Sequence, residues 1–110
     1  MDARVAAAIG IMHESLSLNV SISSISKRVN LSPTRLRQLF HNDIGKSPMQ
    51  HLGDLRMRHA EHLLRNTFLS IKEIAFACGV KHVSSFAHAF KRRHGMTPCE
   101  FRARILSING

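Results

Sequence analysis

The chain has 110 residues, with 16 Lys and Arg against 7 Asp and Glu, so its formal net charge is +9. The length allows one domain or two very small ones and excludes an ordinary nucleotide-binding α/β enzyme, while 44% hydrophobic residues exclude a disordered basic tail. The positive charge favours a polyanionic partner, with nucleic acid ahead of an anionic membrane surface.

Apolar residues at steps of three and four predict an all-α chain, and no Asn-Gly or Asp-Gly hairpin turn occurs. The first predicted helix covers residues 2–17 with Asp2 as its N-cap, and the second covers residues 23–29. The third begins at Ser32-Pro33 and stops before Gly45. The residues predicted to face inward in these helices are Val5, Ala8, Ile9, Met12, Leu16, Ile22, Ile25, Val29, Leu36, Leu39 and Phe40.

Four more helices are predicted in the second half. A long helix covers residues 48–65, and the capping box Ser70-x-x-Glu73 opens a short helix that runs to Cys78. Another helix covers residues 82–94, and Thr97-Pro98 opens the last one. The inward residues expected here are Leu52, Leu55, Met57, Ala60, Leu63, Leu64, Ile74, Cys78, either Val83 or Phe86, then Phe90, Phe101, Ile105 and Ile108.

The cysteines and histidines predict neither a disulfide framework nor a metal site. The two cysteines form no Cys-x-x-Cys pair, which favours a reducing cytoplasm, and Cys78 is interpreted as a small core residue. His59 and His62 could share a helix face, but no carboxylate or cysteine completes a ligand set. We therefore expect no metal and no other cofactor.

An internal repeat is the most informative feature of the sequence. Phe40, Gly45 and Ser47-Pro48 recur 50 positions later as a Phe, a Gly and a Thr-Pro pair. Upstream, the apolar positions from Ile22 to Leu31 recur 49 positions later, which predicts one inserted residue in the second turn. Two short helices joined by a tight turn, present twice, indicate two helix-turn-helix units rather than a helical repeat array.

The first candidate recognition helix begins at Pro33. If Leu36 and Phe40 face inward, an outer stripe of side chains that can hydrogen-bond remains for the bases of DNA. The predicted base contacts are Thr34, Arg37 and Gln38. In the general code Arg pairs with guanine and Gln with adenine. The predicted phosphate contacts of this unit are Ser32, Arg35 and His41.

The second candidate recognition helix, residues 82–94, carries fewer long donors. The predicted base contacts are Val83, Ser84 and His88. Lys81 near its start and the run Lys91-Arg92-Arg93 at its end are suited to phosphates, with Lys81, Lys91 and Arg92 as the predicted contacts.

These residues resemble the DNA-binding domain of the AraC/XylS family of bacterial transcription regulators over about residues 5–104. The most specific motifs are Ile74-Ala75-x-x-Cys78-Gly79-Val80 and Phe86-x-x-x-Phe90-Lys91-Arg92-Arg93-x-Gly95-Met96-Thr97-Pro98-x-x-Phe101-Arg102. The chain departs from the family pattern at three positions: Val80 where an aromatic residue is usual, Asn30 where the first repeat has Gly, and Phe101 where Tyr is common.

The resemblance implies about seven helices forming two helix-turn-helix subdomains. Residues 1–47 would form the first, residues 48–66 a linker helix, and residues 67–110 the second. It also implies sequence-specific binding of double-stranded DNA in adjacent major-groove segments, transcription activation through RNA polymerase, a place on the bacterial nucleoid, and in longer members an N-terminal sensor domain. No membrane association is expected.

Two other classes of function compete with this interpretation. The same basic surface would serve a non-specific architectural DNA-binding module or a protein-interaction module. An enzyme is the third class, but no nucleophile–base pair, phosphate-binding glycine loop or carboxylate dyad is present in the sequence.

Overall fold

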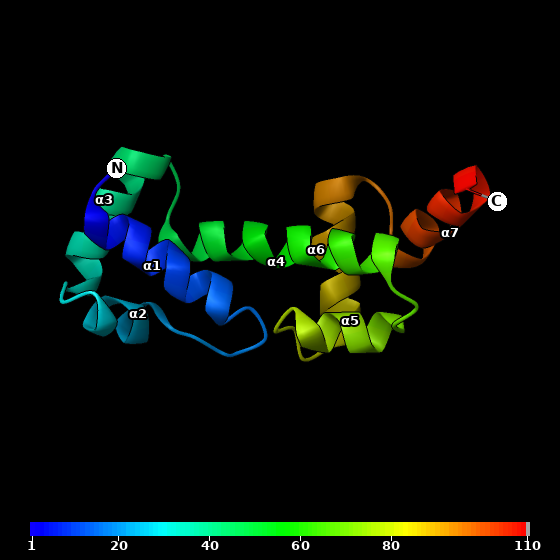
Figure 1. The fold of residues 1–110 in the computed structure, drawn as a ribbon, viewed down its shortest axis with the longest axis horizontal. Coiled ribbons are helices and arrows are strands. Elements are labelled where there is room, and N and C mark those ends of the chain that lie inside the picture. The colour runs from blue at the N-terminus through cyan, green and yellow to red at the C-terminus, as the bar shows by residue number, and fades with distance from the viewer. Residues whose placement is uncertain (110) are drawn as a thin grey trace. The chain divides into compact units, whose positions relative to one another are not determined.

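The computed structural model describes residues 1–109 of the chain, and the side chains of residues 1–107. The described residues form helices and no strand, which confirms the all-α prediction. The helices are α1 (Ala3–Glu14), α2 (Ile22–Arg28), α3 (Pro33–Ile44), α4 (Pro48–Asn66), α5 (Ile71–Ala77), α6 (Val83–His94) and α7 (Pro98–Asn109), shown in Figure 1. Within this part of the chain, none of them is long and apolar enough to cross a membrane.

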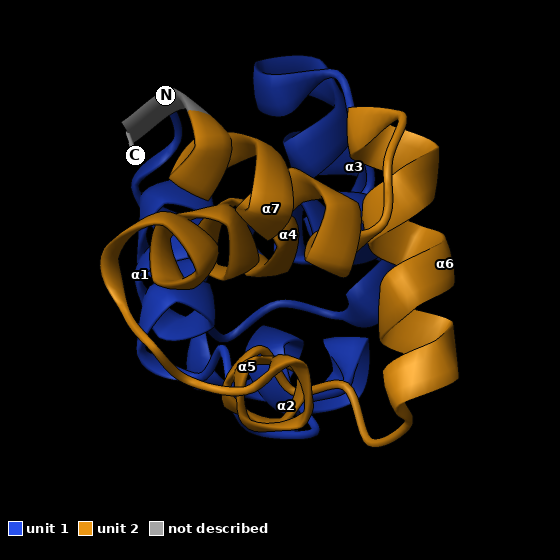
Figure 2. Ribbon diagram, turned by 90° about the vertical axis from the view of Figure 1, so that its right-hand side faces the viewer, with its two compact units in different colours: residues 1–55 blue, residues 56–110 orange. Residues whose placement is uncertain are grey.

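The chain divides into two compact units, residues 1–55 and 56–110, which Figure 2 distinguishes by colour. Helix α4 contributes its first residues to unit 1 and the rest to unit 2. Each unit has its own hydrophobic core. The internal repeat relates four buried positions of the two cores: Ile25, Val29, Leu36 and Phe40 correspond to Ile74, Cys78, Phe86 and Phe90.

In unit 1, helices α1, α2 and α3 pack against one another. Phe40 of α3 is fully buried, and its ring lies 5.7 Å from that of His51 on α4. Lys46 Nζ donates to the buried carboxylate of Asp54 at 2.5 Å, so the buried charge has a cationic partner. The buried core consists of Val5, Ala8, Ile11, Met12, Ile25, Val29, Leu36, Phe40, Leu52 and Leu55.

In unit 2, the buried core consists of Met57, Ala60, Leu64, Ile74, Ala75, Cys78, Phe86 and Phe90. Phe90 lies at its centre, with ring centroids 6.1 Å from Phe86, 4.0 Å from His94 and 5.3 Å from Phe101. Of the two predicted alternatives, Phe86 is buried and Val83 is exposed. The prediction for Ile108 falls outside the described side chains.

The side chain of Arg102 forms hydrogen bonds with the end of α4 and the loop that follows it. Its guanidinium donates to three backbone carbonyl oxygens, at 3.4 Å to Leu64, 3.2 Å to Thr67 and 2.6 Å to Leu69. Carbonyl groups at the C-terminal end of a helix lack intrahelical partners, and a cation is favoured there. Arg102 therefore fastens α7 to the end of α4 within unit 2.

The repeat in the sequence is also a repeat of backbone geometry. After α2, Asn30 takes the left-handed conformation with φ 58°, and Leu31 N donates to Ser26 O at 2.9 Å. After α5, Gly79 takes the same conformation with φ 77°, and Val80 N donates to Ala75 O at 2.9 Å. Asn is the non-glycine residue best suited to this conformation, so Asn30 allows the same turn in unit 1 that Gly79 forms in unit 2. The extra residue of the second unit lies between this turn and α6, as predicted.

Most predicted helix boundaries lie within one residue of the structure, and the end of the first helix differs most. The first helix ends at Glu14 rather than near residue 17. The Ser15 N–H donates to Met12 O and the Leu18 N–H donates to Ser15 O, so the backbone forms turns there instead of continuing the helix. The chain leaves the helical path there, and Leu16 is only partly buried. Ile9, within the helix, is also only partly buried, and Ile11 belongs to the buried core. The second helix begins one residue early, at Ile22, because Ser21 and Ser24 form a capping box.

Helices α3 and α6 differ at their N-caps. Ser32 accepts the N–H of Arg35 at 3.1 Å, whereas His82 has an extended backbone, with φ −114° and ψ 127°, and makes no side-chain cap bond. We expect His82→Ser to raise the free energy of unfolding of unit 2 by about 0.5–2 kcal/mol, because Ser supplies the missing acceptor. Urea denaturation measures this, with Ser32→Ala as the reverse change in unit 1. Unchanged or lower stability of His82→Ser would contradict the expectation.

Candidate nucleic-acid interface

Helix α3 holds the first group of candidate residues on a rigid support. Pro33 occupies its first turn after the Ser32 cap, and Gly45 ends it with φ 79° while its N–H donates to His41 O at 2.9 Å. Leu36 and Phe40 are fully buried, which fixes the rotation of the helix about its axis. Residues three or four positions apart share a face of a helix, so the side chains one or two positions away from Leu36 and Phe40 are turned away from the core.

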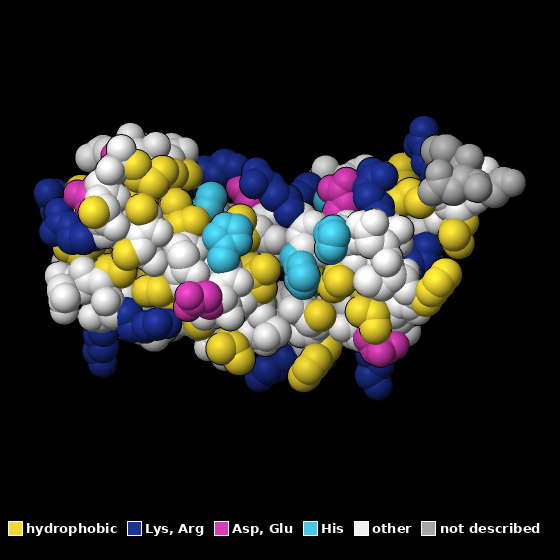
Figure 3. Space-filling model, in the orientation of Figure 1, with side chains coloured by type: hydrophobic (Ala, Val, Ile, Leu, Met, Phe, Trp, Pro, Cys, Tyr) yellow, Lys and Arg dark blue, Asp and Glu magenta, His cyan; other side chains and the backbone are white. Residues whose placement is uncertain are grey.

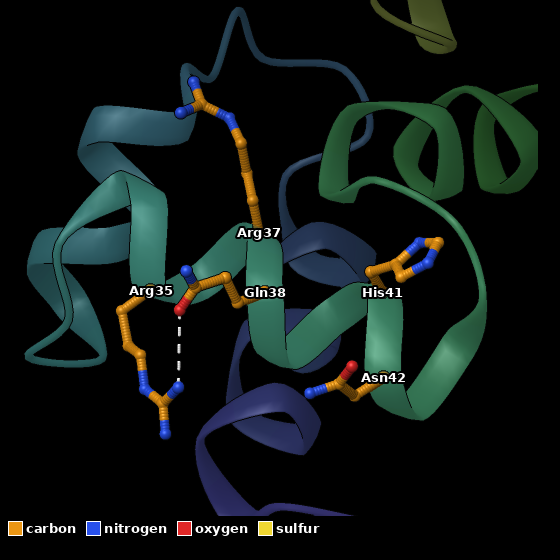
Figure 4. Close-up of a pocket in the computed structure, with 5 residues that line it drawn as sticks. All are labelled: Arg35, Arg37, Gln38, His41 and Asn42. Carbon is orange, nitrogen blue, oxygen red and sulfur yellow. Dashed lines mark hydrogen bonds between the residues drawn. The ribbon is translucent and has the colours of Figure 1, made fainter.

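The outward side chains of α3 are the predicted ones. Thr34, Arg35, Arg37, Gln38 and His41 are all exposed, as is the cap residue Ser32. Figure 4 shows Arg37 extending away from Arg35, while Gln38 lies beside Arg35 on the same helix. Arg35, Arg37, Gln38 and His41 line an open hollow of about 510 Å³ together with Asn42.

Two features of this surface did not emerge from the sequence. Asn42 was not among the predicted site residues, although it follows Gln38 by one helical turn. Arg35 Nη1 donates to Gln38 Oε1 at 3.3 Å. The spacing of three residues allows such a contact, but it does not select it from the alternatives open to two long side chains.

Helix α6 presents the second group. Phe86 and Phe90 are fully buried, and the predicted residues Lys81, Val83, Ser84, His88, Lys91 and Arg92 are all exposed. The side chain of Val83 is 39% exposed on the first turn, which suits an apolar contact. This face has fewer long hydrogen-bonding side chains than that of α3.

Basic side chains dominate the charge of the surface. On the face drawn in Figure 3, Lys and Arg are visible on both units, and Asp and Glu form small separate patches. Several acidic groups are already engaged: Glu61 accepts from Arg65 and pairs with His94, each at 3.2 Å, and Glu73 and Glu100 cap helices. Hydrogen bonding to His94, followed by Arg65, lowers the pKa of Glu61. The Lys and Arg side chains therefore make the electrostatic potential at the surface positive.

The histidines and cysteines do not assemble a metal site in the described part of the chain, where no three His, Cys, Asp or Glu side chains are placed to share an ion. Cys78 is fully buried, which confirms its interpretation as a core residue, and burial raises the pKa of its thiol to about 11. A buried thiol of that kind is chemically inert.

A short helix, a tight turn and a longer helix with an exposed polar face, present once in each unit, define a tandem helix-turn-helix DNA-binding domain. A family described as "Helix-turn-helix domain" matches residues 25–104. The chain belongs to the AraC-type helix-turn-helix family of transcription regulators, as its sequence motifs indicate.

Curated relatives carry the same domain as part of longer proteins. The chain is 32% identical over 95 residues to the Msm operon regulatory protein of Streptococcus mutans, covering 86% of this chain and 34% of that protein. It is 34% identical over 101 residues to the transcriptional activator RhaS of Escherichia fergusonii, covering 92% of this chain and 36% of the relative. The chain thus spans about a third of the length of these relatives.

Solved structures share the fold. The C-terminal domain of AraT, a response regulator from Geobacillus stearothermophilus, matches with a TM-score of 0.90 and 29% identity, over 94% of this chain and 86% of that one. The DNA-binding domain of AdpA, solved in complex with a target DNA, matches with a TM-score of 0.91 and 24% identity, over 96% of each chain. Both confirm the tandem helix-turn-helix architecture.

Proposed function

We propose that this domain binds a specific double-stranded promoter or operator sequence and regulates transcription, by activation. The observation that carries the proposal is that each of two repeated helix-turn-helix units exposes the polar face of its second helix, α3 in unit 1 and α6 in unit 2. Each recognition helix enters the major groove, and the two bound segments are neighbours along one duplex. Residues 1–47 and 67–110 carry these helices, with residues 48–66 as the link.

The base contacts in this proposal come from the exposed stripes already described: Thr34, Arg37, Gln38, Val83, Ser84 and His88. On α3, Arg37 has the five-donor fork that matches the O6 and N7 acceptors of guanine. On α6, Val83 offers an apolar contact to a thymine methyl group and His88 a donor or an acceptor. Most discrimination between sequences therefore comes from α3.

The phosphate contacts are assigned to residues at the ends and flanks of the two helices: Ser32, Arg35, His41, Lys81, Lys91 and Arg92. They fix the register of the helix on the duplex and add affinity for any sequence. We also propose that this domain acts within a longer protein that carries an N-terminal sensor domain, contacts RNA polymerase and lies on the nucleoid in the cytoplasm. The proposal contains no catalytic step.

Arg92→Ala tests the phosphate assignment. We expect it to weaken binding to the operator and to random DNA by the same factor and to reduce the slope of log affinity against log salt by about one. Fluorescence anisotropy titrations at several salt concentrations measure both quantities. Arg104→Ala, which removes the same charge from an exposed position on α7, is the matched control and should leave the slope nearly unchanged. A loss confined to the operator would show that Arg92 contacts a base.

Footprinting on an operator obtained by selection tests the proposal as a whole. We expect protection of two neighbouring major-groove segments. The competing function, a non-specific architectural or protein-interaction module, is favoured by the scarcity of long donors on α6. It predicts one protected segment, or protection no stronger than on random DNA.

A further inference from the structure

The Arg35–Gln38 pair on α3 sets the hydrogen-bonding character of the first recognition helix. The two side chains are exposed and one helical turn apart, and Arg35 Nη1 donates to Gln38 Oε1 at 3.3 Å (Figure 4). Arg35 is also held at its backbone, where its N–H donates to Ser32 Oγ at 3.1 Å. The guanidinium thus lies beside the only acceptor that the glutamine side chain has.

This bond orients the amide of Gln38. A glutamine amide has one carbonyl oxygen that accepts and one NH₂ group that donates. With Oε1 turned to the guanidinium, the NH₂ group is the part of Gln38 left for a DNA base. Arg35 itself has only donors. The pair therefore presents hydrogen-bond donors and positive charge to the groove.

The bases differ in what they offer to such a surface. In the major groove guanine presents two acceptors, N7 and O6, whereas adenine presents the acceptor N7 and the donor N6 amino group. The usual glutamine–adenine pair needs Oε1 to accept from N6. Here N6 would have to share that oxygen with Arg35, beside a guanidinium that disfavours a second donor.

We infer that Gln38 acts as a donor that selects guanine over adenine at its base pair, and that Arg35 is the positioning residue that imposes this choice. The inference rests on the proposed function and departs from the general Gln–adenine code. Arg35 keeps further N–H groups, so its phosphate contact is compatible with this role. Unit 2 has no equivalent pair, because Ser85 and His88 occupy the matching positions of α6.

Selection from a randomised duplex library, followed by sequencing, tests this inference with the whole chain. Gln38→Ala identifies the position that Gln38 contacts, because the base preference there is lost. At that position we expect the wild-type chain to prefer guanine over adenine by about tenfold. Arg35→Ala should lower this ratio by about tenfold or invert it, since Oε1 becomes free to accept from adenine N6.

Two control variants and a stability measurement separate the orientation of the Gln38 amide from the effects of charge and of lost structure. Arg28→Ala removes the same charge from an exposed position on α2 and should leave the base preference unchanged while weakening all sequences slightly. Gln38→Glu removes the donors altogether and should abolish the preference for guanine. Thermal unfolding should be the same for each variant within error, because the side chains concerned are exposed.

The outcomes distinguish this inference from the function on which it rests. An adenine preference in the wild-type chain, a guanine preference unchanged in Arg35→Ala, or no position altered in Gln38→Ala would each overturn the inference while specific binding stands. If the wild-type chain enriches no sequence at all, the proposed function fails as well.

Discussion

Phe90→Ala should lower the free energy of unfolding of unit 2 by about 3–5 kcal/mol, the usual cost of removing a fully buried phenylalanine ring. Phe90 is fully buried and contacts the rings of Phe86, His94 and Phe101. Its loss therefore leaves a cavity at the centre of a small core. Small domains are only marginally stable, and this loss is comparable to their whole free energy of unfolding. We therefore expect unit 2 of this variant to be largely unfolded at 37 °C.

The rate at which a thiol reagent labels Cys78 measures how often unit 2 unfolds. The thiol is fully buried, and burial raises its pKa to about 11, so a thiol reagent labels it only when unit 2 opens. In a Cys99→Ser background, which removes the exposed cysteine, labelling reports on Cys78 alone. We expect rapid labelling in Phe90→Ala and slow labelling in the parent. Leu106→Ala, at a position 58% exposed, is the control and should label slowly. Slow labelling of Phe90→Ala would contradict the assigned core.

Arg37→Ala should cost about 1–3 kcal/mol of binding free energy on the operator and relax the preference at one base pair. Arg37 extends from the exposed face of α3, whose rotation is fixed by the buried Leu36 and Phe40. Its fork can pair with two acceptors of one guanine, which a lysine cannot reproduce. Arg37→Lys should therefore lose most of the discrimination while keeping affinity for random DNA.

Competition binding with the operator, single-base variants and random DNA measures this expectation. Arg28→Ala, the same charge change on α2, should not alter the discrimination. If Arg37→Ala lowers the affinity for every sequence by the same factor, Arg37 contacts a phosphate and not a base.

The helices were predictable because their signals are local. Capping serine and threonine residues, glycine or asparagine at left-handed positions and apolar steps of three and four place most helix boundaries within one residue or two. The error at the end of α1 has a physical reason: Leu16 continues the apolar spacing, but the backbone turns back at Ser15. The spacing of apolar residues does not reveal where the backbone turns in this way.

Contacts between distant residues could not be predicted in the same way. Arg102 was recognised as part of a motif, but its three carbonyl partners lie 33–38 residues earlier in the chain. The pairing of Lys46 with the buried Asp54 was likewise unforeseen. Each depends on how helices and loops meet in space, whereas the sequence pattern constrains each helix separately.

The candidate site was predictable in its membership but not in its chemistry. Once Leu36, Phe40, Phe86 and Phe90 are assigned to the core, helical geometry alone exposes the predicted contact residues. The orientation of the Gln38 amide is different, because it depends on which rotamers Arg35 and Gln38 adopt together. The base preference that we infer for Gln38 rests on that orientation and so required the structure.

The ratio of affinities for the selected operator and for random duplex DNA, measured at physiological salt, tests the central claim most directly. Two recognition helices that contact base edges predict a ratio of about 10³ or more. A ratio near one would mean that the basic surface binds DNA without distinguishing sequences, and it would contradict the assignment of α3 and α6 as sequence-specific recognition helices.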